Sequence, residues 1–234
     1  MNYTIISEKG KVREKNEDDY LINIEDEFKV FAVADGMGGH EAGDVASALA
    51  IETINNYQFD ADDLADEIRK AIDLANKKIC IKSKDVNKKM GTTITLAIVN
   101  KNIVKIGHVG DSRAYIYDDK QLKQVTKDHS YVRQLVKKGL ISESEAENHP
   151  QKNLLLRALG TEQEVEIDLI EVGINEGDLL LLCSDGLTNM VAEKEIIRIL
   201  DMESELSAKA DKLVEIANEN GGHDNITVLI YRNK

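Results

Sequence analysis

The sequence contains no tryptophan, a single proline, Pro150, and two cysteines, Cys80 and Cys183. The cysteines lie far apart in no metal-binding spacing, so we expect no disulfide framework and interpret both as reduced core residues. The longest wholly apolar run, Leu179 to Cys183, is far too short to span a bilayer. The first residues also lack the apolar stretch of a signal peptide, and a cytoplasmic location is therefore expected.

The chain also has fewer basic residues, 30, than acidic ones, 43, and it has little linker-like sequence. Its formal charge of −13 argues against binding to nucleic acid or to an anionic membrane, because both are held mainly by surplus Lys and Arg. No Ser/Gly/Pro-rich tract or tandem repeat divides the 234 residues. Residues 1–234 are therefore predicted to form one domain with a substantial core.

In the stretch Phe28 to His40, a predicted apolar strand leads directly into a carboxylate, Asp35, and then into glycines. Side chains alternate along a strand, so Phe31, Val33 and Asp35 are expected on one face, which would bury the carboxylate. A buried carboxylate needs a cation or hydrogen-bond donors, and the glycines after it would let a ligand approach the backbone. This junction is the first candidate for chemistry.

Three other predicted strand ends also carry an aspartate beside glycine. Asp185 follows the strand that contains Leu181 and Cys183, and we expect all three side chains on one face. Asp111 follows the strand Ile103–Val109, and Asp224 precedes the strand Ile226–Tyr231. Each site alone is compatible with an ordinary turn. Four such sites together indicate a shared function.

The order of predicted elements favours antiparallel sheets with helices packed on their outer faces, an α+β fold. Strands come in runs, and amphipathic helices are expected around residues 46–54, 64–79, 193–200 and 206–220. Residues 128–160 interrupt a strand meander with a short helix that Gly139 should stop and with a capping box, Ser142-x-x-Glu145. We interpret this segment as a mobile flap beside a cleft.

The sequence does not match several common functional motifs. The glycines after Asp35 lack the third glycine of a dinucleotide fingerprint, since Glu41 occupies that position. Ser112 is followed by a strand where a nucleophile elbow requires a helix, and His108 is expected to pack within a strand. Arg13 lies in an acidic turn and, on its own, suits a surface ion pair as well as a phosphate.

Taken together, six short motifs resemble the metal-dependent Ser/Thr protein phosphatases of type 2C in their bacterial form. They are Arg13-x-x-Asn16-Glu17-Asp18, Asp35-Gly36-Met37-Gly38-Gly39-His40, Gly91-Thr92-Thr93, Gly110-Asp111-Ser112-Arg113, Ser184-Asp185-Gly186 and Asp224-Asn225. The resemblance spans residues 2–232 and implies a four-layer α-β-β-α sandwich with metals in a cleft at one edge.

The resemblance also implies a set of metal ligands. Asp35 matches the carboxylate that bridges two metal ions, and Asp185 and Asp224 match the remaining protein ligands of the first ion. Gly36 resembles the residue whose carbonyl helps to hold the second. Asp111, with Asp185, matches the pair that holds a third, weaker ion.

Other positions match residues that handle the substrate and the water. Arg13 resembles the phosphate clamp, and His40 matches the histidine proposed in the family as general acid. Glu17, Asp18 and Asn225 resemble residues that orient metal-bound water from behind the ligands.

These residues fit Mg²⁺ or Mn²⁺, because the ligands are oxygens and neither cysteine nor paired histidine is present. The implied reaction is hydrolysis of phosphoserine or phosphothreonine by direct attack of a metal-bridging water. Implied partners are phosphoproteins, including a bacterial Ser/Thr kinase and its substrates, and we expect a monomer. The alternatives are a phosphatase for a small metabolite or a partner-switching regulator, and a non-catalytic phosphoprotein-binding module.

Overall fold

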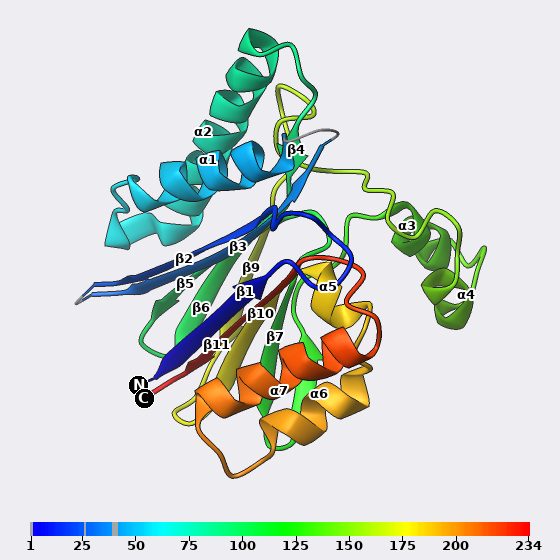
Figure 1. The fold of residues 1–234 in the computed structure, drawn as a ribbon. Coiled ribbons are helices and arrows are strands. Elements are labelled where there is room, and N and C mark those ends of the chain that lie inside the picture. The colour runs from blue at the N-terminus through cyan, green and yellow to red at the C-terminus, as the bar shows by residue number, and fades with distance from the viewer. Residues whose placement is uncertain (1, 26, 39–41) are drawn as a thin grey trace.

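The structure, a computed structural model, describes residues 2–25, 27–38 and 42–234. Two antiparallel sheets pack face to face, with helices on their outer surfaces (Figure 1). The first sheet contains, in order, β1 (Tyr3–Glu8), β11 (Ile226–Arg232), β10 (Leu179–Cys183), β7 (Arg113–Asp118) and β8 (Gln121–Gln124). The second contains β2 (Asp18–Ile24), β3 (Lys29–Met37), β5 (Ile94–Asn100), β6 (Ile103–Val109) and β9 (Asp168–Gly173), with β4 (Gly91–Thr92) paired to β3.

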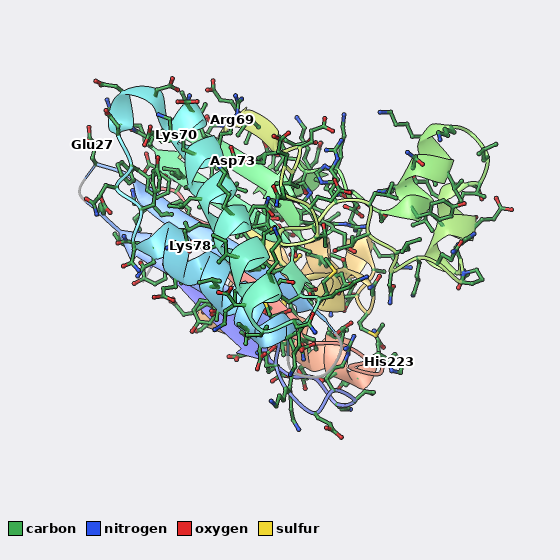
Figure 2. All side chains as sticks on the ribbon, turned by 90° about the horizontal axis from the view of Figure 1, so that it is seen from above. Glu27, Arg69, Lys70, Asp73, Lys78 and His223 are labelled. Atoms are coloured by element: carbon green, nitrogen blue, oxygen red, sulfur yellow. The ribbon has the colours of Figure 1, made fainter. Side chains whose placement is uncertain are left out.

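Helices cover both outer faces of this sandwich. The second sheet carries α1 (Gly43–Asn55), a 3₁₀ turn (Ala61–Asp63) and α2 (Leu64–Asp85), and the first carries α5 (Asp185–Thr188), α6 (Glu193–Leu200) and α7 (Leu206–Glu219). Two short helices, α3 (Tyr131–Lys137) and α4 (Glu143–Glu147), stand away from the sandwich (Figures 1 and 2). The predicted α-β-β-α architecture is confirmed. In the part of the chain described above, no helix is long and apolar enough to cross a membrane.

Side chains on the two faces of β3 pack into two different hydrophobic cores. Phe31 and Val33 point between the sheets, where the ring centroid of Phe31 lies 4.9 Å from that of Tyr231 on β11. Ala32 and Ala34 point the other way, into the core beneath α1 and α2. Because both faces are buried, the strand reads as an almost continuous apolar run. Asp35 therefore continues the face that lies between the sheets, as predicted.

The strand before Asp185 does not place Leu181, Cys183 and Asp185 on one face, although the sequence predicted that it would. Leu181 and Cys183 pack on the outer face of the first sheet, beneath α6 and α7. Asp185 does not share that face, because the strand ends at Cys183 and Asp185 is the first residue of α5. The turn into the helix redirects its carboxylate toward the edge of the sandwich.

Most other boundaries agree with the sequence within a few residues. β6 and α6 have the predicted limits, and the Ser142–Glu145 capping box is present. Cys183 is fully buried as predicted, whereas Cys80 is only partly buried.

Candidate active site

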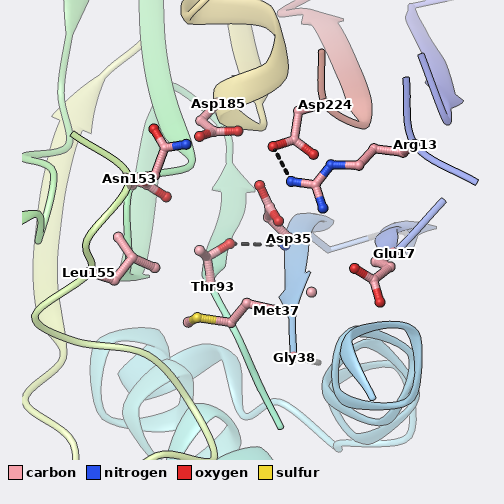
Figure 3. Close-up of a pocket in the computed structure, with 12 residues that line it drawn as sticks. Arg13, Glu17, Asp35, Met37, Gly38, Thr93, Asn153, Leu155, Asp185 and Asp224 are labelled. Atoms are coloured by element: carbon pink, nitrogen blue, oxygen red, sulfur yellow. Dashed lines mark hydrogen bonds and ion pairs between the residues drawn. The ribbon is translucent and has the colours of Figure 1, made fainter. Parts of the chain in front are cut away.

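A cleft opens at one edge of the sandwich, where the ends of β3, β6, β10 and β11 meet (Figure 3). It is lined by Arg13, Glu17, Asp35, Gly36, Met37, Gly38, Thr93, Asp111, Asn153, Leu155, Asp185 and Asp224. The structure thus brings all four strand-end aspartates together with Arg13 and Glu17. Asp18 and Asn225 lie directly behind the lining, and His40 is outside the described residues.

Asp35 is held by its backbone at the end of β3. Its N–H donates to Thr93 Oγ1 at 2.9 Å, and its carbonyl accepts from the Thr93 N–H at 2.9 Å and from Thr92 Oγ1 at 2.9 Å. The side chain is left to face the cleft (Figure 3). Burial, reinforced by the charges of the neighbouring aspartates, raises the pKa of the Asp35 carboxyl well above its usual range.

Asp185 and Asp224 face Asp35 from the other sheet. Oδ2 of Asp185 accepts from Asn189 at 2.9 Å, while its buried Oδ1 has no hydrogen-bond partner among the described residues. Burial and then the charge of Asp224 raise the pKa of Asp185 to about 6. Asp224 forms a 2.8 Å ion pair with Arg13 (Figure 3). Burial opposes the charge of Arg13, but the attraction to Asp224 outweighs it and raises the pKa of Arg13.

Asp111 lies in the turn that follows β6. Burial and the charge of Asp185 raise its pKa well above the usual range. The next residue, Ser112, is buried, and its hydroxyl pairs with Thr93 Oγ1 at 2.7 Å. Since Thr93 also accepts from the backbone of Asp35, one pair of hydroxyls fixes the Asp111 turn relative to β3.

Asp18 lies beside Asp35, directly opposite it in the antiparallel β2–β3 pair. One oxygen, Oδ2, accepts from Ser184 Oγ and from Thr227 Oγ1, both at 2.7 Å. The other has no hydrogen-bond partner in the described part of the chain. Burial raises the pKa of Asp18 to about 7, against the opposing effect of these two hydroxyls.

Asn225 fastens the loop that carries Arg13. Its side-chain carbonyl accepts from the Glu17 N–H at 2.8 Å, and its amide donates to the carbonyls of Lys9 and Lys15. These contacts hold both ends of the Arg13 loop, and the role in orienting water that the resemblance implies for Asn225 stays a prediction. Burial raises the pKa of Glu17, which faces the same cleft.

Two glycines allow the backbone segments around the cleft to approach closely. A Cβ at Gly36 would lie 2.3 Å from the Gly43 carbonyl oxygen and 2.5 Å from that of Glu17. A Cβ at Gly186 would lie 2.0 Å from the Asn225 carbonyl oxygen. All three distances are shorter than any tolerated contact, so a larger residue at either position would push these backbone segments apart.

The sequence reasoning did not identify Met37, Gly38, Asn153 or Leu155 as cleft residues. Asn153 and Leu155 come from the 128–160 segment, and Leu155 forms an isolated antiparallel bridge with Ser130. No periodicity or motif marks Asn153 and Leu155, because their place depends on how that segment folds back, whereas Met37 and Gly38 lie within the motif that begins at Asp35.

The carboxylates fit a divalent cation. Their raised pKa values mean that the protein around them disfavours bare negative charge, and a hard cation can replace the protons. The unpartnered Oδ1 of Asp185 and the all-oxygen donor set suit Mg²⁺ or Mn²⁺. In the present geometry, no three Asp, Glu, His or Cys side chains of the described residues stand close enough together to enclose an ion.

Comparisons with known proteins identify the family to which this chain belongs. Residues 9–227 match the family described as protein phosphatase 2C. The serine/threonine phosphatase stp of Listeria welshimeri is 45% identical over 96% of this chain and 92% of its own length. The crystal structure of the serine/threonine phosphatase PstP/Ppp of Mycobacterium tuberculosis, 37% identical, superposes with a TM-score of 0.91 over 99% of this chain and 98% of that one.

A further structure is the catalytic domain of PstP in complex with two manganese ions, which is 36% identical. It matches with a TM-score of 0.88 over 98% of this chain and 96% of that one. The similarities extend over nearly the whole chain and include both sheets and the cleft between their ends. This chain belongs to the protein phosphatase 2C family.

Proposed function

We propose that this chain is a metal-dependent protein phosphatase that hydrolyses phosphoserine and phosphothreonine. The observation that carries the proposal is the convergence of Asp35, Asp111, Asp185 and Asp224 from four strand ends, beside one arginine. The family membership and the phosphatase relatives support it. Residues 1–234 act as one catalytic unit, because the cleft takes side chains from both sheets.

The residues that would hold the metal ions are Asp35, Asp185 and Asp224, together with the carbonyl of Gly36. Asp111, with Asp185, would hold a further, weaker ion. Bound Mg²⁺ or Mn²⁺ supplies Lewis-acid charge and lowers the pKa of a water held in the cleft. Asp18, fixed by two hydroxyls, and Glu17 orient that water from the side of β2.

Arg13 holds the phosphoryl group. A guanidinium has five N–H donors, so Arg13 can keep one on Asp224 and present others to phosphoryl oxygens. Asn225 maintains this position by fastening the Arg13 loop at Glu17, Lys9 and Lys15. His40 is assigned to protonating the leaving serine or threonine oxygen, a role that remains a sequence-based prediction.

Residues 128–160 act as a flap that contacts the substrate. Asn153 and Leu155 reach the cleft from this segment, while α3 and α4 stand away from the sandwich (Figure 1). Substrates are phosphoproteins, and a bacterial Ser/Thr kinase would supply them.

The test is turnover of a phosphothreonine peptide with millimolar Mn²⁺, after chelation by EDTA, and after Mn²⁺ is restored. We expect activity only when the metal is present. Full activity after exhaustive chelation, or metal binding without any turnover of phosphopeptides, would refute the proposal.

A further inference from the structure

The chain concentrates positive charge in one place despite its formal charge of −13. Residues 77–89, which we call the basic segment, comprise the second half of α2 and the loop that leads to β4. The segment contains one acid, Asp85, and six lysines: Lys77, Lys78, Lys82, Lys84, Lys88 and Lys89. α2 is the outermost helix on its side of the molecule, and Lys78 projects from it (Figure 2).

Most of this charge is not neutralised within the protein. Lys77, Lys78, Lys82, Lys84 and Lys89 are exposed, and no ion pair joins any of these five to another described residue. Lys70, in the first half of the same helix, differs because it pairs with Asp66 and Glu67. The basic segment therefore presents cations that are available to a partner.

Apolar side chains lie among these lysines. Ile81 is 59% exposed, and Leu74 and Val86 are each 40% exposed. Leu74, Lys78 and Ile81 follow the three- and four-residue spacing that places side chains on one helix face. A face that serves only solubility would not need exposed isoleucine and leucine, whereas a face that binds a polypeptide uses both kinds of contact.

The basic segment ends at the rim of the cleft. The carbonyl oxygen of Lys89 lies 3.3 Å from the position of a Cβ at Gly38, which lines the cleft. Two residues later, a Cβ at Gly91 would lie 3.6 Å from Cε of Met37, another lining residue. A chain with its phosphorylated residue in the cleft can therefore continue along this segment.

We propose that the basic segment binds acidic flanks of phosphorylated protein substrates, that is, stretches with several Asp or Glu residues or additional phosphate groups beside the hydrolysed one. This inference rests on the proposed phosphatase function. The formal charge of −13 disfavours such flanks over the protein as a whole, whereas the lysines of the basic segment attract them.

The same helix argues against a long polyanion as the partner. Its N-terminal end and the preceding turn carry Asp60, Asp62, Asp63, Asp66 and Glu67. A nucleic acid or a membrane surface lying along α2 would meet these acids, whereas a short acidic peptide can contact the lysines alone.

The experiment compares the triple variant Lys82→Glu/Lys84→Glu/Lys89→Glu with a control of equal charge change. The control, Lys123→Glu/Lys194→Glu/Lys234→Glu, alters exposed lysines on β8, on α6 and just after β11, on the other side of the sandwich. Two phosphothreonine peptides share one phosphosite and differ only in having Asp/Glu or Asn/Gln flanks. p-Nitrophenyl phosphate serves as a substrate without flanks.

We expect wild type and control to favour the acidic peptide by about tenfold in kcat/KM at low salt, since a few exposed charge pairs together reach that size. The basic-segment variant should lose the preference and keep its activity on p-nitrophenyl phosphate. Absence of the preference in wild type, its persistence in the variant, or an equal loss in the control would overturn the inference. Failure of wild type to hydrolyse either peptide would instead refute the proposed function.

Discussion

His108 should make the stability of the fold depend on pH in a way that a single substitution removes. The residue lies on β6 and is fully buried, with Nδ1 3.0 Å from Thr95 Oγ1 and its ring centroid 4.8 Å from that of His129. Its Nε2 has no hydrogen-bond partner among the described residues. Burial, with a smaller effect of His129, lowers the pKa of His108 to about 4.

The sign follows from the difference between the folded and unfolded states. An unfolded histidine takes up a proton below about pH 6.5, whereas folded His108 stays neutral until about pH 4. The lowered pKa therefore contributes stability above pH 6.5, and this contribution is lost as the pH falls toward 4. Between pH 7.5 and pH 5.0 the loss amounts to about 2 kcal/mol in the free energy of unfolding.

The assay is urea unfolding in EDTA at these two pH values for wild type and for His108→Gln, which cannot titrate. The raised pKa values of the cleft aspartates act in the opposite direction, but they are common to both proteins and cancel in the comparison. Wild type should lose about 2 kcal/mol more than the variant on acidification. Equal losses in the two proteins would show that His108 is charged in the native state or reaches water.

Three further predictions concern the cleft. Asp35→Asn should abolish both turnover and the binding of the two core ions, as measured by titration calorimetry. Asp111→Ala should still bind two ions and only lower the rate. Loss of every ion in Asp111→Ala would contradict the assignment of metal ligands. Leu155→Ala should alter the ratio of kcat/KM between two phosphopeptides with little effect on p-nitrophenyl phosphate, while exposed Leu154→Ala should leave that ratio unchanged. His40→Ala should slow hydrolysis of a phosphothreonine peptide by about a hundredfold to ten-thousandfold, but that of p-nitrophenyl phosphate far less, because nitrophenolate leaves without a proton. Equal losses on both substrates, with metal content intact, would assign His40 a structural role.

The local parts of this fold could be predicted from the sequence because each carries its own signal. β6 is a mostly apolar run that is buried on both faces from Ile106 to Val109, and α6 shows a strong helical period, so both were placed correctly. Asp35 was also placed on the correct face, since β3 continues through it.

Residues whose positions depend on contacts distant in the sequence could not be predicted from local patterns. Asp185 was assigned to a strand face because no local signal shows that α5 begins there. Asn153 and Leu155 reach the cleft only because their segment folds back against residues near Ser130. The role of Asn225 in holding the Arg13 loop joins residues about 210 positions apart, which no spacing rule detects.

β11 lies between β1 and β10 in the first sheet and follows directly on Asp224. A ribosome that has released only the first 220 residues has therefore produced neither an interior strand of that sheet nor one of the four aspartates of the cleft. Until residues 224–232 emerge, β1 and β10 both present open edges, which are sites of mispairing with other chains. The nascent protein should thus remain unable to cleave phosphate until β11 has paired with β1 and β10.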